Sequence, residues 1–157
     1  MAMKELYGVT VVSEKELFSL NVDVYSPCAR GATLNDSTIP QLKATIVAGC
    51  ANNQLENEAT HSKMLKKSNI LYAPDYVINA GGVINVANEL SGYNRQKVEH
   101  EVAQISKTLD TIFQAAEKRD ITTHESANKF AEDRINGVRN IKHLTTKDSS
   151  FFGSLTK

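Results

Sequence analysis

Short apolar runs alternate with polar segments through the first half of the chain. Residues 9–12, 22–25, 45–48 and 70–72 are rich in the β-branched and aromatic side chains that favour strands. Residues 56–67, between the last two runs, form a polar segment typical of a helix. Strands and helices that alternate at this spacing predict a parallel sheet. We therefore expect an α/β fold with a partial Rossmann-like parallel sheet of about four strands.

After Tyr72 the pattern takes on a helical period, so long helices are expected to follow the sheet. A first segment, which Gly92 ends, has apolar residues on one helix face: Val83, Val86, Ala87 and Leu90. A longer segment has a narrow stripe with spacings of four and three, which predicts packing on another helix or another subunit: Val98, Val102, Ile105, Leu109, Ile112 and Ala116. A last helix is predicted over residues 127–135, with Gly137 near its end.

Two short sequences have the form of a capping box, in which a hydroxyl and a carboxylate satisfy free amides at a helix start. These are residues 13–16 (Ser-Glu-Lys-Glu) and residues 122–125 (Thr-Thr-His-Glu). Each predicts that a helix begins at that point.

Composition narrows the classes of partner. Lys plus Arg and Asp plus Glu number 18 each, so a net charge of zero gives no support for nucleic acid or a charged membrane surface. With 41% hydrophobic and 23% charged residues, and no segment that suggests a signal peptide or a membrane span, we expect a cytoplasmic globular protein. Cys28 and Cys50 follow no zinc or CxxC spacing, which predicts buried reduced thiols, a disulfide being the less favoured alternative. The four histidines have no metal-ligand spacing, so no metal site is predicted.

Candidate chemistry lies where the predicted strands end. Ligands of open parallel sheets bind beyond the carboxyl ends of the strands, and residues 26–29, 49–53 and 73–82 stand at such ends. Each has a plain interpretation: Ser-Pro stops a strand, Asn52 caps a helix, and Gly81-Gly82 starts one. Together, their amides and small residues favour a cofactor crevice. The amide of Asn52 can donate and accept hydrogen bonds, which suits a carboxamide or a ribose hydroxyl.

Four segments carry a resemblance to a known family. DVYSPCA (residues 23–29), TIPQLKA (38–44), ANNQL (51–55) and YAPDYVINAGGVINV (72–86) resemble the glutamate/leucine/phenylalanine/valine dehydrogenases. The resemblance covers about residues 5–140, and its details are most similar to the leucine dehydrogenases of the family. It implies an oxidoreductase of amino-acid metabolism that converts a branched-chain L-amino acid to a 2-oxo acid and ammonia with NAD as cofactor.

The resemblance also implies roles for individual residues at the cofactor. Cys28 and Ala29 are expected along the NAD, near its ribose, and Asn52 at the nicotinamide, with Asn53 behind it. Arg30 stands where the family usually has an aliphatic residue. It could contact a phosphate, but a partly exposed side chain lying along the surface is the simpler interpretation.

Val83 and Val86 are the residues that the resemblance places in the substrate pocket. An apolar wall leaves a charged side chain unpaired, which argues against glutamate as substrate and for an aliphatic amino acid. Leucine, valine and isoleucine differ by one methylene or less, worth only about 1–3 kcal/mol, so the residues leave these substrates open.

Several parts that the family needs are not found in this sequence. The chain contains no GxGxxG, and the resemblance places that phosphate fingerprint and the ribose-binding acid upstream of Leu6. The catalytic lysine and aspartate belong to a separate substrate domain. We therefore expect residues 1–144 to be a truncated dinucleotide-binding domain with its C-terminal helices and residues 145–157 a flexible tail. No catalytic residue is assigned, and the chain alone is expected to be inactive.

Truncation also bears on assembly. Loss of the first strands would expose an edge of the strand at residues 22–25, and exposed edges pair with other chains. We expect a homo-oligomer or a strand-swapped dimer. The alternative function is a stand-alone remnant that acts as a binding or oligomerisation module, and a third possibility is an unrelated ligand-binding α/β domain.

Overall fold

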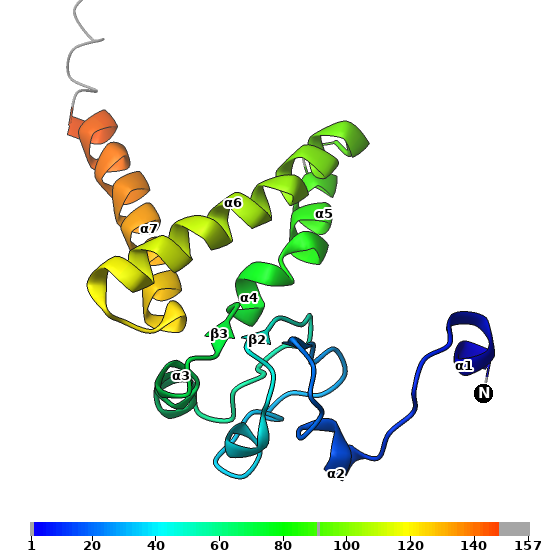
Figure 1. Ribbon diagram of the computed structural model, residues 1–157. Helices are drawn as coiled ribbons and strands as arrows, with labels where there is room; N and C mark the ends of the chain where they lie inside the picture. Colours follow the sequence, from blue (N-terminus) through cyan, green and yellow to red (C-terminus); the bar gives the residue numbers. More distant parts are fainter. Residues whose placement is uncertain (1, 91, 148–157) are drawn as a thin grey trace, which may run out of the picture.

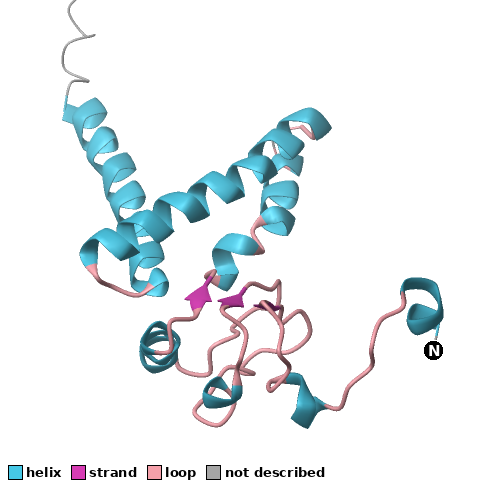
Figure 2. Ribbon diagram, viewed as in Figure 1, coloured by secondary structure: helices cyan, strands magenta, loops and turns pink. Residues whose placement is uncertain are grey.

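The sheet is small and parallel. The computed structural model describes residues 2–90 and 92–147. Within them, β1 (Val24–Tyr25), β2 (Ile46–Val47) and β3 (Leu71–Tyr72) form a three-stranded sheet in the order β1-β2-β3 (Figure 2). Val47 pairs with Tyr25 on one side and with Tyr72 on the other, and these three side chains are buried. The predicted α/β class with a parallel sheet is confirmed.

The strand predicted at residues 9–12 is wrong. These residues form no regular element between α1 (Ala2–Tyr7) and α2 (Glu14–Leu17), and the Val11 side chain is 78% exposed. Figure 1 shows this segment running away from the sheet toward α1. A β-branched run becomes a strand only where a neighbour takes up its backbone hydrogen bonds. Three strands are therefore described instead of about four, and each is two residues long.

Both predicted capping boxes are confirmed. At the start of α2, the Ser13 hydroxyl accepts from the Glu16 amide, and the Glu16 carboxylate accepts from the Ser13 amide at 3.0 Å. The same exchange joins Thr122 and Glu125 ahead of α7 (Thr123–Lys147), at 2.9 and 3.0 Å. The sequence alone located these two helix starts.

The hydrophobic core lies between the sheet, the 3₁₀ turn η1 (Ile39–Gln41) and α3 (Glu58–Lys67). Leu34, Val47 and Leu65 are fully buried there. Asn57 caps α3 through its side chain, so the helix begins slightly later than residue 56, where the sequence placed it. The turn η1 was not predicted, because a single turn has no periodicity to recognise.

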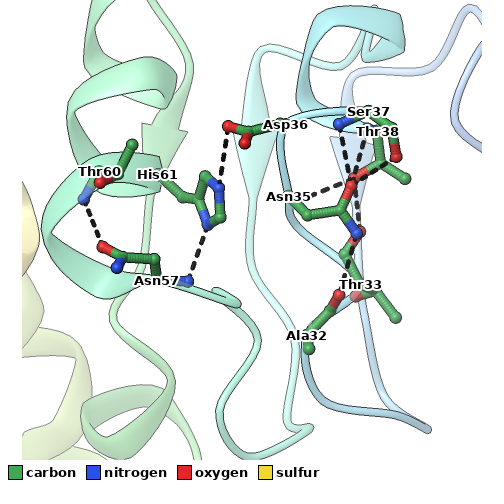
Figure 3. A network of polar contacts seen from close by, with 9 residues as sticks. All are labelled: Ala32, Thr33, Asn35, Asp36, Ser37, Thr38, Asn57, Thr60 and His61. Carbon is green, nitrogen blue, oxygen red and sulfur yellow. Dashed lines mark hydrogen bonds and ion pairs between the residues drawn. The ribbon is translucent and has the colours of Figure 1, made fainter.

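A buried histidine joins α3 to the loop ahead of η1 (Figure 3). Nδ1 of His61 accepts from the Asn57 amide at 2.8 Å, which leaves Nε2 to donate to Asp36 at 3.3 Å. In the same loop, Asn35 accepts from the amides of Ser37 and Thr38. His61 is thus a structural residue, consistent with the absence of metal-ligand spacing in the sequence.

Helices dominate the second half. After β3 come α4 (Asp75–Ile78), α5 (Gly81–Glu89), α6 (Arg95–Arg119) and α7, and α6 crosses between α5 and α7 (Figure 1). Val98, Ile112 and Ala116 of the predicted stripe are buried in α6. The stripe packs on α4, α5 and α7 of the same chain, which confirms the predicted helix–helix contact.

The last helix is longer than the sequence suggested. The sequence predicts an end near Gly137, but α7 continues through that glycine to Lys147. A single glycine weakens a helix by only about 1 kcal/mol, which does not stop it. Residues 145–147 of the predicted flexible tail are therefore helical, and residues 148–157 lie outside the described residues. No helix in the described part is long and apolar enough to cross a membrane.

Candidate functional site

The three segments that follow the strands meet at one rim, as their positions in the sequence predicted. Beyond the sheet, the chains after β1 and β2 continue side by side, with the Ala48 amide on the Tyr25 carbonyl and the Ala51 amide on the Pro27 carbonyl, both at 3.0 Å. Gly49 permits this approach. A Cβ at Gly49 would lie 2.2 Å from the Pro27 carbonyl oxygen, closer than real Cβ contacts. Backbone contacts between the segments after β1 and β2 therefore hold this part of the rim together.

The four predicted cofactor residues lie on this rim. The loop after Cys28 and Ala29 packs against Asn52 and Asn53: the Ala32 amide donates to the Asn53 carbonyl at 2.7 Å. Asn53 has a φ of 52°, a left-handed conformation that asparagine tolerates better than most residues. All four predicted side chains are exposed. Their grouping is a fact of the structure, and their contact with a cofactor stays a prediction.

Gln54 is a positioning residue for which the sequence reasoning gave no role. It is fully buried, and its Nε2 donates to the carbonyls of Gly49 and Ala51 at 2.7 and 3.0 Å. Its backbone amide donates to Asp75 at 2.9 Å. The sequence signal that could have identified Gln54 is a polar residue that stands between the Asn52-Asn53 pair and the apolar Leu55. Gln54 thereby holds the turn at residues 49–53 in shape.

Asn79 orients Asn52 across the rim. Its Nδ2 donates to Oδ1 of Asn52 at 2.6 Å and to the Cys50 carbonyl at 3.4 Å. This bond engages the side-chain oxygen of Asn52. The NH₂ group of Asn52 is therefore left to donate to another acceptor. Asn79 was placed on the rim by the sequence, but only the structure gives it this partner.

The two cysteines do not match their prediction. Both are free, as expected, but both are exposed instead of buried, because they stand where the chain leaves the sheet. The Ser26 hydroxyl lies 3.3 Å from the Cys28 sulfur and lowers the pKa of that thiol, with further contributions from the amide and thiol of Cys50. The Cys28 thiol in turn raises the pKa of Cys50.

A groove of about 650 Å³ runs along the open edge of β1. Phe18, Val22 and Val24 form its apolar wall, and Cys28 and Ala29 lie at its end toward the rim. Val22 and Val24 are 43% and 47% exposed. Arg30 also lines the groove and is exposed, which agrees with a surface side chain.

Val83 and Val86 lie on an exposed apolar face of α5. Their side chains are 68% and 59% exposed, whereas Asn88 on the face toward α6 is buried. Asn88 donates to Glu101 of α6 at 2.7 Å, so a polar contact holds the helix pair. The apolar face predicted from the periodicity therefore points away from the neighbouring helix, and no described residue encloses a substrate pocket around these two valines.

Within residues 2–90 and 92–147, no cluster of three or more metal-ligating residues was found. His124, one of the buried histidines, lies 3.4 Å from Glu58 and 3.0 Å from Asn128. The ring of Tyr76 packs edge-on against it, and burial raises the pKa of Tyr76 to about 12. These contacts stabilise the start of α7 against α3 and α4.

Comparison with known proteins gives relatives over most of the chain. An L-tryptophan dehydrogenase of Nostoc punctiforme is 54% identical over 140 residues, which are 89% of this chain and 40% of that protein. A leucine dehydrogenase of Bacillus cereus is 47% identical over 136 residues, 87% of this chain and 37% of the relative. The chain thus spans about two fifths of the length of these relatives.

The fold agrees with that of a solved structure. The crystal structure of L-tryptophan dehydrogenase from Nostoc punctiforme matches with a TM-score of 0.85 and 53% identity, over 88% of this chain and 41% of the other. A sequence model of the family described as Glutamate/Leucine/Phenylalanine/Valine dehydrogenase matches residues 2–142. With nearly the whole chain matched and the rim built from the family-like segments, this chain belongs to the glutamate/leucine/phenylalanine/valine dehydrogenase family.

Proposed function

We propose that this chain is the nicotinamide-side part of the dinucleotide-binding domain of an NAD-dependent amino-acid dehydrogenase. The rim where Asn52 and Asn79 meet is the observation that carries the proposal. In the whole enzyme, it faces a substrate domain that supplies the catalytic lysine and aspartate. When bound there, NAD⁺ supplies the acceptor for the hydride that leaves the amino acid.

The residues of the rim fit a nicotinamide carboxamide. Asn79 holds the oxygen of the Asn52 side chain at 2.6 Å, so the NH₂ group of Asn52 can donate to the carboxamide oxygen. Asn53 supports the turn through its backbone. Cys28 and Ala29, exposed at the end of β1, would lie along the ribose. These contacts orient the cofactor and do not move protons.

For the substrate, we propose a branched-chain amino acid of the leucine type. Val83 and Val86 form an exposed apolar face that a second domain can close into a pocket. An apolar wall disfavours glutamate, whose carboxylate would be buried without a partner. The identity of 47% with a leucine dehydrogenase supports this choice.

L-Tryptophan is the second candidate substrate. The identity of 54% with an L-tryptophan dehydrogenase favours it, and an apolar wall accepts an indole as readily as an isobutyl group. The two substrates differ greatly in volume, so the depth of the completed pocket decides between them. That depth depends on the second domain that would close the pocket.

A binding or oligomerisation module remains the alternative function for the chain alone. The open β1 edge and the exposed face of α5 are surfaces that another chain can cover. Copurification with a longer dehydrogenase subunit would support this function. In either case we place the protein in the cytoplasm.

The decisive experiment joins this chain to the part of a related dehydrogenase that the chain does not cover. The two polypeptides are expressed together and assayed for NADH formation with L-leucine, L-valine, L-isoleucine, L-tryptophan and L-glutamate, and for NADPH formation with NADP⁺. We expect turnover of the branched-chain substrates with NAD⁺ and none by either polypeptide alone. Turnover by this chain alone, or none by the complemented enzyme, contradicts the proposal. Preference for L-tryptophan selects the second candidate.

A second measurement separates binding from catalysis. Calorimetric titration of this chain with NAD⁺ should give weak affinity, because it lacks the phosphate-binding turn at a helix N-terminus. In the complemented enzyme, Asn52→Ala should raise KM for NAD⁺ more than Thr60→Ala, a substitution on the exposed side of α3. If the two substitutions change KM for NAD⁺ equally, Asn52 does not contact the cofactor.

A further inference from the structure

The only two cysteines of the chain lie in the segments that follow the neighbouring strands β1 and β2. Tyr25 of β1 pairs with Val47 of β2 in parallel register. Cys28 follows Tyr25 by three residues, and Cys50 follows Val47 by three residues. Neighbouring strands are about 4.8 Å apart. A disulfide needs a Cα separation of about 4.4–6.8 Å, which residues on chains that stay side by side at this spacing can satisfy.

The chains stay together up to the cysteines. Gly49, next to Cys50, approaches Pro27, next to Cys28, so closely that a Cβ at Gly49 would lie 2.2 Å from the Pro27 carbonyl oxygen. The Ala51 amide then donates to the Pro27 carbonyl at 3.0 Å. The two side chains are thus held at adjacent places on the rim, where the Cys50 thiol contributes to the lowered pKa of Cys28.

The environment of the pair distinguishes an attacking thiol from a resolving thiol. Both side chains are exposed and reachable by a solute. The Ser26 hydroxyl, followed by the amide and thiol of Cys50, lowers the pKa of Cys28. The Cys28 thiol raises the pKa of Cys50. Cys28 therefore has the greater thiolate fraction at neutral pH, and the thiolate is the nucleophile.

We propose that Cys28 and Cys50 form an oxidisable dithiol that closes to a reversible intrachain disulfide on reaction with hydrogen peroxide. The inference rests on the placement of the two sulfurs at the ends of β1 and β2 and does not depend on the proposed enzymatic function. It assigns Cys28 as the attacking sulfur and Cys50 as the resolving one.

The reaction balances in two steps. The Cys28 thiolate attacks a peroxide oxygen, the O–O bond breaks, and the leaving oxygen takes a proton to become water, which leaves a sulfenic acid. Cys50 then attacks the sulfur of that sulfenic acid, the S–O bond breaks, and a second water leaves with the Cys50 proton. Overall, each sulfur is oxidised by one electron, and each of the two peroxide oxygens is reduced by one electron as it becomes water. A dithiol reductant such as dithiothreitol reverses the change by thiol–disulfide exchange.

Peptide mapping tests the link directly. The chain is treated with hydrogen peroxide, the remaining thiols are alkylated, and the protein is digested with trypsin without reduction. Cleavage after Arg30 and Lys43 separates Cys28 and Cys50 into different peptides, so a disulfide joins two peptides that are otherwise apart. We expect this linked pair, the loss of both free thiols, an unchanged monomer position on a non-reducing gel, and recovery with dithiothreitol.

Two single variants define the roles of the sulfurs. In Cys50→Ser, the sulfenic acid at Cys28 has no resolving partner, so dimedone should label it, whereas the wild type should show little label. In Cys28→Ser, Cys50 should react with peroxide more slowly than Cys28 does in Cys50→Ser. Iodoacetamide at neutral pH should modify Cys28 of the reduced wild type before Cys50.

Specific results overturn the proposal. If peroxide gives only linked chains, with Cys28 joined to Cys28 or Cys50 to Cys50, the pair does not close within one chain. If both cysteines of the wild type are oxidised to sulfinic acid without a linked peptide, the resolving role is wrong. Faster alkylation of Cys50 than of Cys28 reverses the assigned roles and contradicts the attacking function of Cys28.

Discussion

Asp75 and Gln54, 21 residues apart in the sequence, are joined by a buried hydrogen bond of 2.9 Å from the Gln54 amide to Oδ2 of Asp75. The other carboxylate oxygen accepts from the Tyr76 amide at 2.7 Å. One side chain thereby fixes the segment after β3 against the turn after β2. The candidate site depends on this link, because the same turn carries Asn52 and Asn53.

Asp75→Asn should destabilise the protein. An asparagine keeps one acceptor oxygen but turns an NH₂ group toward the second amide, which leaves a buried donor without a partner. We expect the free energy of unfolding to fall by about 1–3 kcal/mol in urea denaturation. The control Asp110→Asn, on the exposed side of α6, should change it by no more than about 0.5 kcal/mol. Equal stability of the two variants would show that the buried bond contributes nothing.

Gly49→Ala and Gly82→Ala form a matched pair of substitutions. A Cβ at Gly49 would lie 2.2–2.7 Å from backbone atoms of Pro27, whereas one at Gly82 meets nothing within 4 Å. Overpacking against backbone should cost at least about 1–3 kcal/mol at Gly49. In α5, alanine should stabilise by up to about 1 kcal/mol at Gly82. Thermal unfolding of both variants tests the close approach of the β1 and β2 ends, and an unchanged Tm for Gly49→Ala would contradict it.

Thr122→Ala removes the hydroxyl that accepts from the Glu125 amide at 3.0 Å. Thr122 is 3% exposed and begins a helix that packs on α6, so we expect a loss of about 1 kcal/mol of unfolding free energy. Ser13→Ala breaks the equivalent bond at α2, which has no buried residue, and should leave global unfolding unchanged. If both variants lose the same unfolding free energy, the packing of the helix does not determine how much its N-cap contributes to stability.

The carboxylate of Glu125 adds a dependence on pH. Its hydrogen bond from the Thr122 amide lowers its pKa below the ordinary value of 4.5. A lowered folded-state pKa contributes stability above the unfolded-state value, and that contribution is lost as the pH falls through the folded-state value. The wild type should therefore exceed Glu125→Gln in stability at pH 7, and the difference should shrink at pH 3. A difference that is constant over this range would exclude the charge of Glu125 as its source.

Val24→Lys tests the open edge of the sheet. β1 pairs only with β2 in the described sheet, and the Val24 side chain is 47% exposed in the groove along the edge. If the chain dimerises through this edge, sedimentation should show a dimer for the wild type and a monomer for Val24→Lys, because edge lysines oppose strand pairing. Thr60→Lys, on the exposed side of α3, should remain a dimer. A monomeric wild type at low concentration would refute the predicted association.

Patterns within one segment were the most reliable guide to the fold. The capping boxes at Ser13 and Thr122, the stripe of α6 and the parallel strands after residue 22 all follow from local chemistry and spacing. The run at residues 9–12 has strand propensity but no neighbour, and it is not a strand. The apolar face of α5 has helical spacing, yet it is exposed, because periodicity identifies a face and not what covers it.

By itself, the sequence determined the α/β class, the family resemblance and the fact that the segments after the strands share one rim, because strand direction forces their ends together. Only the tertiary structure decided which atoms meet there: Asn79 on Asn52, Gln54 on Asp75, and the exposure of Cys28 and Cys50. These contacts join residues that are distant in the sequence. They depend on the register of β1, β2 and β3 and on the close approach at Gly49, and neither is encoded in the spacing of any single segment.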